Sequence, residues 1–422
     1  MFACALAAVC ALVVPAPGAA SSFVRYGIQD DAWLVYGPGT LESRFDRLES
    51  LGVKLVRFNL RWDEIARRRP ENPRSSRDPA YRWGTPDAVL RGLRKRRIVA
   101  LVTLLGTPRW ANGGNAFNSA PTDGTSFGNF AFAAASRYGW VRDWLVWNEP
   151  NQRRWLRPTS ARVYTLRLLN PAYREIHRAI PGARVAGGAT APRANFGGVS
   201  PIAWIRGMRQ SRALLDAYAH HPYPLRPKTE SPTAGACARC ATITMATLDR
   251  LLGEVRRAFG PKRIWLTEYG YQTNPPDSLL GVSQLLQARY LSEAAELVHR
   301  APLVDVLIQF LVVDDSDLAG WQSGLFRRNG TPKLSATAFV LPFAQTSRRG
   351  FRTVLWGQLR LGSGRRPFRL QEARGGEWVF TGGTRLTNAR GVLSVVVRAE
   401  RGSLLRVWSP RDGLFSAPLV VR

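Results

Sequence analysis

The chain has 422 residues, of which 45 % are hydrophobic and 14 are Trp, and its 60 basic residues outnumber 30 acidic ones. This composition excludes an intrinsically disordered chain, and the length suits two or three domains or one large α/β barrel with an appendage. Beyond the first 20 residues, no uninterrupted apolar run approaches the roughly 20 residues that span a bilayer. We therefore expect a soluble mature protein with no membrane span.

The net charge of +30 comes from 55 Arg and only five Lys. Such a skew is explained at least as well by GC-rich codon usage as by a phosphate-bearing partner. The arginines do not gather on one helix, in a zinc-finger spacing or in a terminal arm, as a nucleic-acid footprint usually requires. We expect no nucleic-acid partner, although the charge favours anionic surfaces.

The N-terminus begins with an apolar stretch over residues 2–14, followed by Pro15, Pro17 and small residues up to Ala20. This pattern is typical of a secretory signal peptide over residues 1–20. The basic residues that normally precede the apolar run are missing, so we expect the signal to be truncated. A short buried helix is the weaker alternative, because prolines rather than amphipathic sequence follow it. The sequence thus predicts a secreted, extracellular protein that loses Cys4 and Cys10 with the signal.

The mature chain would keep two cysteines, Cys237 and Cys240. In an exported protein, such a close pair indicates a local disulfide. Two thiols cannot complete a four-ligand zinc site, and His177 and His299 lie in predicted helices far apart in the sequence. We expect the disulfide and no metal.

Strand-like and helix-like segments alternate for about 320 residues. The expected strands cover residues 24–28, 54–59, 98–105, 141–147, 184–187, a segment ending at 220, 263–267 and 304–311. The expected helices lie near residues 41–52, 85–93, 127–138, 160–179, 202–208, 248–259, 282–299 and 335–343. Eight strands alternating with helices predict an α/β protein with a closed (β/α)8 TIM barrel, and the glycine fingerprint of nucleotide-binding sheets is absent after the first strand.

The pattern changes near Gln345 to short alternating stretches separated by Gly pairs. Residues 346–422 hold 15 Arg and four acidic residues, a local net charge of +11. The sequence therefore predicts a barrel over residues 21–345 and a small, basic, all-β, sandwich-like module over 346–422.

Two glutamates directly follow apolar strands, where the catalytic face of a barrel lies. Glu149 ends the fourth strand in Asn148-Glu149-Pro150, and Glu268 ends the seventh. One such Glu alone is more often a surface residue or half of a salt bridge, but two on opposite sides of an eight-strand ring can face each other. Paired carboxylates are what cleavage of a glycosidic bond needs, one to protonate the leaving oxygen and one to attack the sugar or direct water.

With these two motifs the chain resembles the clan A glycoside hydrolases, whose barrels carry Asn-Glu-Pro at strand four and a nucleophilic Glu at strand seven. The segments 221–224 (His-Pro-Tyr-Pro) and 106–111 (Gly-Thr-Pro-Arg-Trp-Ala) are most similar to family 39-like and family 5-like members. The resemblance covers about residues 23–345 and rests on four motifs in the right order.

The resemblance implies a role for each matching residue. Glu149 would be the general acid/base and Glu268 the nucleophile. The other expected substrate-site residues are Asn148 at the sugar 2-hydroxyl, Arg57 beside the nucleophile, and His221 with Tyr223 at the cleavage subsite. The alternative for the last two is ordinary loop packing.

One departure concerns the eighth strand, where these families commonly carry a Trp that floors the cleavage subsite. Here Phe310 or Trp321 would substitute. Trp62, Trp110 and Trp155 lie in loops of the expected catalytic face, where each either stacks on a sugar or packs against its neighbours. Of the three, Trp110 is the one that we expect to bind substrate.

The sequence thus predicts an exported, retaining glycosidase that acts on a β-linked oligo- or polysaccharide, needs no cofactor and contacts anionic cell-surface polymers through its tail. Two alternatives stay open: a non-catalytic carbohydrate-binding protein, and an anion- or cell-wall-binding protein in which the barrel is a scaffold. The sugar, the linkage and endo or exo action are not determined by these motifs.

Overall fold

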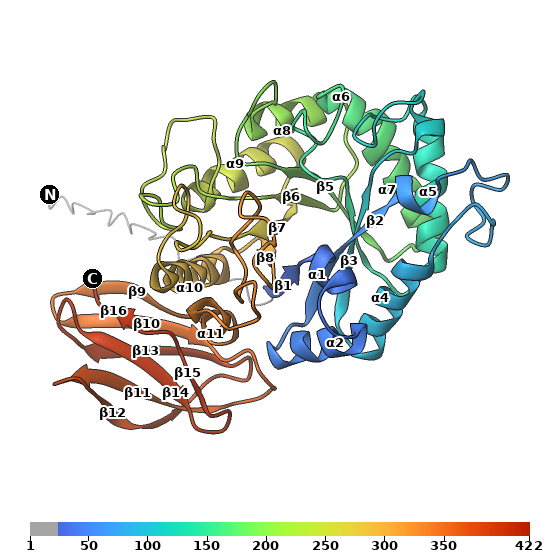
Figure 1. Ribbon diagram of the computed structural model, residues 1–422. Helices are drawn as coiled ribbons and strands as arrows, with labels where there is room; N and C mark the ends of the chain where they lie inside the picture. Colours follow the sequence, from blue (N-terminus) through green and yellow to red (C-terminus); the bar gives the residue numbers. More distant parts are fainter. Residues whose placement is uncertain (1–23) are drawn as a thin grey trace, which may run out of the picture.

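The computed structural model describes residues 24–422, so the expected signal segment 1–20, with Cys4 and Cys10, lies outside the described residues. Eight parallel strands pair in sequence order, and the last pairs with the first to close a barrel (Figure 1). The strands are β1 Arg25–Gln29, β2 Leu55–Arg61, β3 Val99–Leu105, β4 Asp143–Val146, β5 Arg184–Thr190, β6 Ala217–His220, β7 Arg263–Tyr269 and β8 Val304–Phe310. The predicted (β/α)8 fold is confirmed.

Helices surround this ring and cover its outer face (Figure 1). They are α1 Asp31–Tyr36, α2 Leu41–Ser50, α3 Trp62–Ile65, α4 Gly84–Lys95, η1 Arg109–Ala111, α5 Gly124–Arg137, α6 Ala161–Tyr164, η2 Thr165–Leu169, α7 Asn170–Ala179, α8 Pro201–Gln210, η3 Met245–Thr247, α9 Leu248–Phe259, α10 Gln284–Arg300 and α11 Leu334–Val340. Inside the ring, small and branched side chains such as Leu55, Ala186 and Ile308 fill the barrel around Trp265. The barrel is therefore a packed core, and a ligand can bind only at its ends.

The single helix expected over residues 160–179 is interrupted. A π-helical turn, η2, separates α6 from α7, and the Asn170 N–H donates to the Thr165 carbonyl five residues back. Pro171 causes this departure, because proline has no N–H to continue the regular ladder.

The last barrel helix also ends earlier than expected, at Val340 rather than 343. Leu341 precedes Pro342, and a residue before proline disfavours the helical conformation. The chain therefore turns extended, and the strands of the C-terminal module begin at Phe343.

The module is a sandwich of two antiparallel sheets. One has the order β13-β10-β9, and the other has β12-β11-β14-β15 with β16 added to β14. Their bounds are β9 Phe343–Arg349, β10 Arg352–Gln358, β11 Pro367–Arg374, β12 Glu377–Leu386, β13 Val392–Arg398, β14 Leu404–Ser409, β15 Leu414–Phe415 and β16 Leu419–Val420. Residues of both sheets, including Leu355, Leu370, Leu393 and Val407, form one core.

The first sheet faces the barrel. Ala344 of β9 and Trp356 of β10 pack against Ala295 of α10. In Figure 1, β11 and β12 lie on the side of the module away from the barrel. The two sheets thus have different surroundings, and the second exposes an outer surface.

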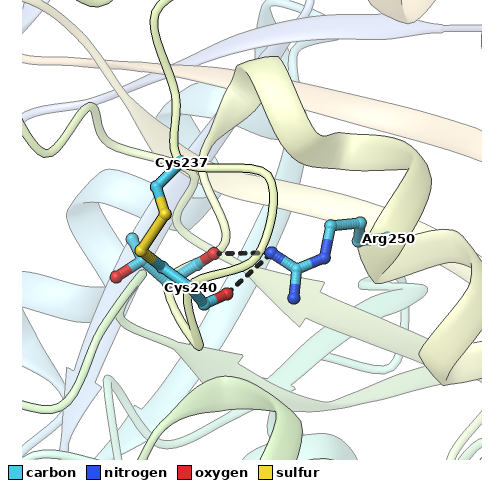
Figure 2. The surroundings of a disulfide bond; sticks show 4 residues. Cys237, Cys240 and Arg250 are labelled. Atoms are coloured by element: carbon cyan, nitrogen blue, oxygen red, sulfur yellow. Dashed lines mark hydrogen bonds between the residues drawn. A yellow bond between two sulfur atoms is a disulfide. The ribbon is translucent and has the colours of Figure 1, made fainter.

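Cys237 and Cys240 lie in the long loop between β6 and α9. A disulfide joins Cys237 to Cys240, and Arg250 of α9 donates from Nη1 to the Cys240 carbonyl at 2.7 Å (Figure 2). The bridge thus sits beside a helix that anchors its loop. Within residues 24–422, none of the helices has both the length and the apolar character needed to cross a membrane.

Candidate active site

The end of β4 presents Glu149 in a distorted backbone. Trp147 and Glu149 have φ angles of 71° and 38°, in the left-handed region that costs an L-residue about 1–2 kcal/mol. Tertiary contacts hold this conformation: the Glu149 N–H donates to the Ala189 carbonyl at 2.9 Å, and the Trp147 indole donates to the Trp155 carbonyl at 2.8 Å. The turn places Glu149 at the rim of the barrel, with 19 % of its side chain exposed.

Arg57 of β2 lies under the site and is fully buried. Its Nη1 donates to Glu268 Oε1 at 2.8 Å, and its Nη2 donates to Asn148 Oδ1 at 2.7 Å. The guanidinium also donates to Thr103 Oγ1 and to the Thr267 carbonyl, both at 3.0 Å. One cation therefore holds the ends of β4 and β7 together and places a positive charge beside the Glu268 carboxylate.

His221 lies between the two glutamates and is fully buried. Its Nδ1 is 3.0 Å from Glu149 Oε1, while its Nε2 is 3.1 Å from Thr267 Oγ1 and 3.4 Å from Arg57 Nη1. Because Arg57 can only donate, the fitting tautomer accepts at Nε2 and donates from Nδ1 to Glu149. Burial lowers the pKa of His221 to about 4, so the ring is neutral at pH 7.

The two carboxyl groups have different electrostatic surroundings. Burial raises the pKa of Glu149 to about 7, although the positive charges of Arg57 and Arg154 oppose this shift. Glu268 instead accepts hydrogen bonds from Arg57 and, at 3.2 Å, from the Tyr223 hydroxyl. Glu149, which is half protonated near neutral pH, thus lies beside Glu268, which accepts hydrogen bonds from Arg57 and Tyr223.

The two carboxyl groups are also close. A carboxylate oxygen of Glu149, one of Glu268 and a ring nitrogen of His221 lie within 4.8 Å of one another. These three groups are near enough to ligate an ion, but the Arg57 guanidinium already supplies a positive charge to Glu268. The structure gives no reason to add a metal, and the absence of one stays a prediction.

Three aromatic side chains form a cluster that includes Tyr223, the hydrogen-bond donor to Glu268. Tyr223, after β6, stacks on Trp321 with ring centroids 5.1 Å apart. Phe310, at the end of β8, meets Tyr223 and Trp321 edge-on, at 6.4 and 5.8 Å. The two candidates for the missing strand-eight Trp therefore act as one cluster, because they pack on the same tyrosine.

A cavity of about 600 Å³ opens over these groups. The predicted residues that line it are Asn148, Glu149, Tyr223, Glu268, Phe310 and Trp321, whereas Arg57 and His221 are fully buried. Trp155, for which stacking on a sugar and packing were both left open, also lines the cavity.

Trp110 lies elsewhere, contrary to the expectation that it contacts substrate. Its indole donates to the Ala66 carbonyl at 2.7 Å and packs edge-on against buried Trp62 at 5.5 Å. It is absent from the lining of the cavity. Trp110 instead packs against α3, through Trp62 at its start and Ala66 at its end, a role that the loop sequence does not reveal.

Sequence reasoning missed polar groups on two cavity walls. Asp31, after β1, accepts from Asn59 Nδ2 at 2.7 Å and from Gln29 Nε2 at 3.2 Å, and burial raises the pKa of Asp31. On the other wall, Arg154 and Arg193 come from the loops after β4 and β5. Asp31 could have been found by the rule that found Glu149, because it is a carboxyl residue that closely follows an apolar strand. The two arginines carried no such signal in a chain with 55 of them.

The geometry defines a closed (β/α)8 barrel with two facing carboxyl groups above its β4 and β7 ends. No protein-family profile and no curated protein sequence matches the chain. Solved structures do share its fold, and they are clan A (β/α)8 glycoside hydrolases of several families, with no single family determined.

CelM2, a bifunctional glucanase-xylanase from a metagenome library, is 12 % identical over 92 % of this chain and 96 % of its own, with a TM-score of 0.52. A family 1 β-glucosidase from Thermotoga maritima is 13 % identical over 74 % of this chain and 96 % of its own, with a TM-score of 0.50. Bacteroides uniformis β-glucuronidase 2, bound to a cyclophellitol-type inhibitor, is 13 % identical over 95 % of this chain, with a TM-score of 0.50. This chain spans only 46 % of that enzyme. At these identities the likeness shows the fold alone.

Proposed function

We propose that this protein is a retaining glycoside hydrolase that cleaves a β-linked oligo- or polysaccharide by double displacement. The single observation that carries the proposal is the carboxyl pair, with oxygens of Glu149 and Glu268 within 4.8 Å of each other. Retaining enzymes hold their carboxyl groups about 5 to 5.5 Å apart, whereas inverting enzymes leave about 6.5 to 9.5 Å for a water molecule.

The electrostatic surroundings support one role for each carboxyl group. Glu268, ion-paired with Arg57 at 2.8 Å, is the nucleophile that attacks the anomeric carbon. Glu149, whose pKa burial raises to about 7, donates its proton to the leaving oxygen and then takes one from the water that releases the sugar. Asn148 binds the sugar 2-hydroxyl, and Trp321 with Phe310 forms the floor that a Trp supplies in the resembled families.

The β configuration is drawn from the similar structures, whose names describe a glucanase-xylanase, a β-glucosidase and a β-glucuronidase. The loop motifs around Trp110 and His221 favour a relation to families 39 and 5. Export is proposed as well, on the apolar N-terminal stretch and on the Cys237–Cys240 disulfide.

The test is trapping of the covalent intermediate. A panel of 2,4-dinitrophenyl 2-deoxy-2-fluoro-β-glycosides should label the wild-type protein on Glu268, as mapped by mass spectrometry of its peptides. Glu268→Gln should not be labelled, because the amide is too poor a nucleophile. Glu64→Gln is the matched control, since Glu64 lies on the same end of the barrel but does not line the cavity.

Label that persists in Glu268→Gln, or a first product of inverted anomeric configuration by NMR, would remove Glu268 as nucleophile. Glycan binding without turnover of any glycoside would favour the non-catalytic carbohydrate-binding alternative.

A further inference from the structure

The outer surface of the second module sheet carries four aromatic rings and two arginines. Inward residues such as Leu405 and Val407 alternate with outward ones on β14. We define the outer face by its outward side chains: Arg369, Trp378, Phe380, Arg406, Trp408 and Phe415. Phe380 and Phe415 are each 37 % exposed. The face extends from β12, on the far side of the module, to Phe415, which lies beside α11 of the barrel. Exposed apolar rings gathered on one surface are not needed for the core and mark a binding surface.

Cross-strand pairing brings these side chains together. Trp408 of β14 stands opposite Arg369 of β11 on one side and Phe415 of β15 on the other. The Phe380 and Trp408 rings are 5.3 Å apart, and those of Trp408 and Phe415 are 6.3 Å apart. The rings thus form a continuous row that crosses the four strands β12, β11, β14 and β15.

The arginines are inserted between these rings. Arg369 Cζ lies 3.6 Å from the centre of the Phe380 ring. Arg406 Cζ lies 4.2 Å from the Trp378 ring and 4.0 Å from the Phe415 ring. Among residues 24–422, neither arginine forms an ion pair with a carboxylate, in contrast to Arg366 nearby, which pairs with Asp412. The rings therefore orient two guanidinium groups whose charges are not neutralised by the protein.

We propose that the outer face binds an acidic polysaccharide and anchors the protein to it. Aromatic rings present flat apolar surfaces on which the C–H faces of pyranose rings stack, while guanidinium groups bind carboxylate or sulfate oxygens. The module's net charge of +11 complements a polyanion. A surface of aromatic rings and arginines can also bind single-stranded nucleic acid. We favour a glycan because the barrel of the same chain has a glycosidase-type site. This choice of ligand therefore rests on the proposed function.

The test uses the full chain in affinity electrophoresis with two polymers that share one β-1,4-glucan backbone: anionic carboxymethylcellulose and neutral hydroxyethylcellulose. Carboxymethylcellulose should retard the protein more strongly, and added NaCl should weaken the effect because salt screens exposed charges. Trp378→Ala/Trp408→Ala and Arg369→Gln/Arg406→Gln should each lower the association constant about tenfold, the size expected for central aromatic and arginine contacts.

Matched controls come from the other sheet of the module. Phe351→Ala removes an aromatic ring that is 58 % exposed, and Arg398→Gln removes an exposed charge on β13. Both should bind like the wild type. Should the tryptophan variant fail to fold by circular dichroism, the arginine variant tests the same surface.

Equal retardation by the two polymers, equal loss in the control variants, or stronger competition by a 30-nucleotide oligothymidine than by carboxymethylcellulose would overturn the proposal. Because binding is read without turnover, it does not depend on catalysis. Failure of the fluorosugar to label Glu268 would refute the proposed function and leave this result standing.

Discussion

The pKa of Glu149 leads to a quantitative expectation for the pH profile. A carboxyl group with a pKa of about 7 is about 90 % protonated at pH 6 and about 10 % protonated at pH 8. If Glu149 must donate a proton, kcat/KM for a glycoside with an alkyl or sugar leaving group should fall about tenfold between these pH values. A dinitrophenyl glycoside, whose leaving group needs no proton, should show no such decrease.

Two arginines in the cavity allow this pKa to be moved. Arg154 and Arg193 line the cavity on the Glu149 side, and their positive charges lower the pKa of Glu149. Their removal destabilises the carboxylate form, so Arg154→Gln/Arg193→Gln should raise the pKa and shift the alkaline decrease to higher pH. Arg153→Gln is the matched control, because Arg153 is exposed, adjacent in sequence and outside the cavity lining.

The assay is kcat/KM from pH 5 to 9 for both substrates, in the wild type and the three variants: the double variant, Arg153→Gln and Glu149→Gln. The alkaline decrease should vanish in Glu149→Gln, which should spare the dinitrophenyl substrate far more than the alkyl glycoside. A decrease that persists in Glu149→Gln, or that moves to lower pH when the arginines are removed, would refute Glu149 as the acid.

Four other predictions concern stability and binding. Arg57→Met should lower the free energy of unfolding in urea by about 3 to 5 kcal/mol, because it leaves the buried oxygens of Glu268 and Asn148 without their donor; a loss below about 1 kcal/mol would contradict this. Burial lowers the pKa of His220 to about 3, whereas its pKa in the unfolded chain is about 6.5. The contribution of the neutral ring to the free energy of unfolding is therefore fully present above about pH 6.5 and is lost as the pH falls toward 3. His220→Asn should therefore reduce the slope of unfolding free energy against pH by about 1.4 kcal/mol per pH unit between pH 5 and 4, and an unchanged slope would count against a buried neutral ring. Trp321→Ala should raise KM for a glycoside, because Trp321 lines the cavity. Trp110→Ala should lower the melting temperature and leave KM unchanged, because Trp110 packs against Trp62. The reverse pattern would show that Trp110 contacts the substrate. Mass spectrometry of the non-reduced, alkylated protein should find no free thiol at Cys237 or Cys240, and two alkylated residues there would show that the bridge is absent.

The order of strands and helices could be predicted because the pattern is local. Apolar strands, amphipathic helices and turn residues repeat eight times, and parallel strands so connected close into a ring. The carboxyl ends of the strands then meet on one face. Glu149 and Glu268 could therefore be expected to face each other, although 118 residues lie between them in the sequence. Their catalytic roles stay predictions. The break at Pro171 was equally local, but strand and helix periodicity did not reveal it.

Which side chains are buried at the site was decided by packing. The family resemblance placed Arg57 beside Glu268, but its full burial and its second hydrogen bond, to Asn148, depend on the convergence of β2, β4 and β7. Trp110 and Trp321 both stand in loops after strands, yet one packs beneath its loop and the other stacks on Tyr223 in the cavity. Periodicity predicts which face of an element is apolar; which distant segment covers that face depends on long-range contacts, and these exist only once the chain is folded.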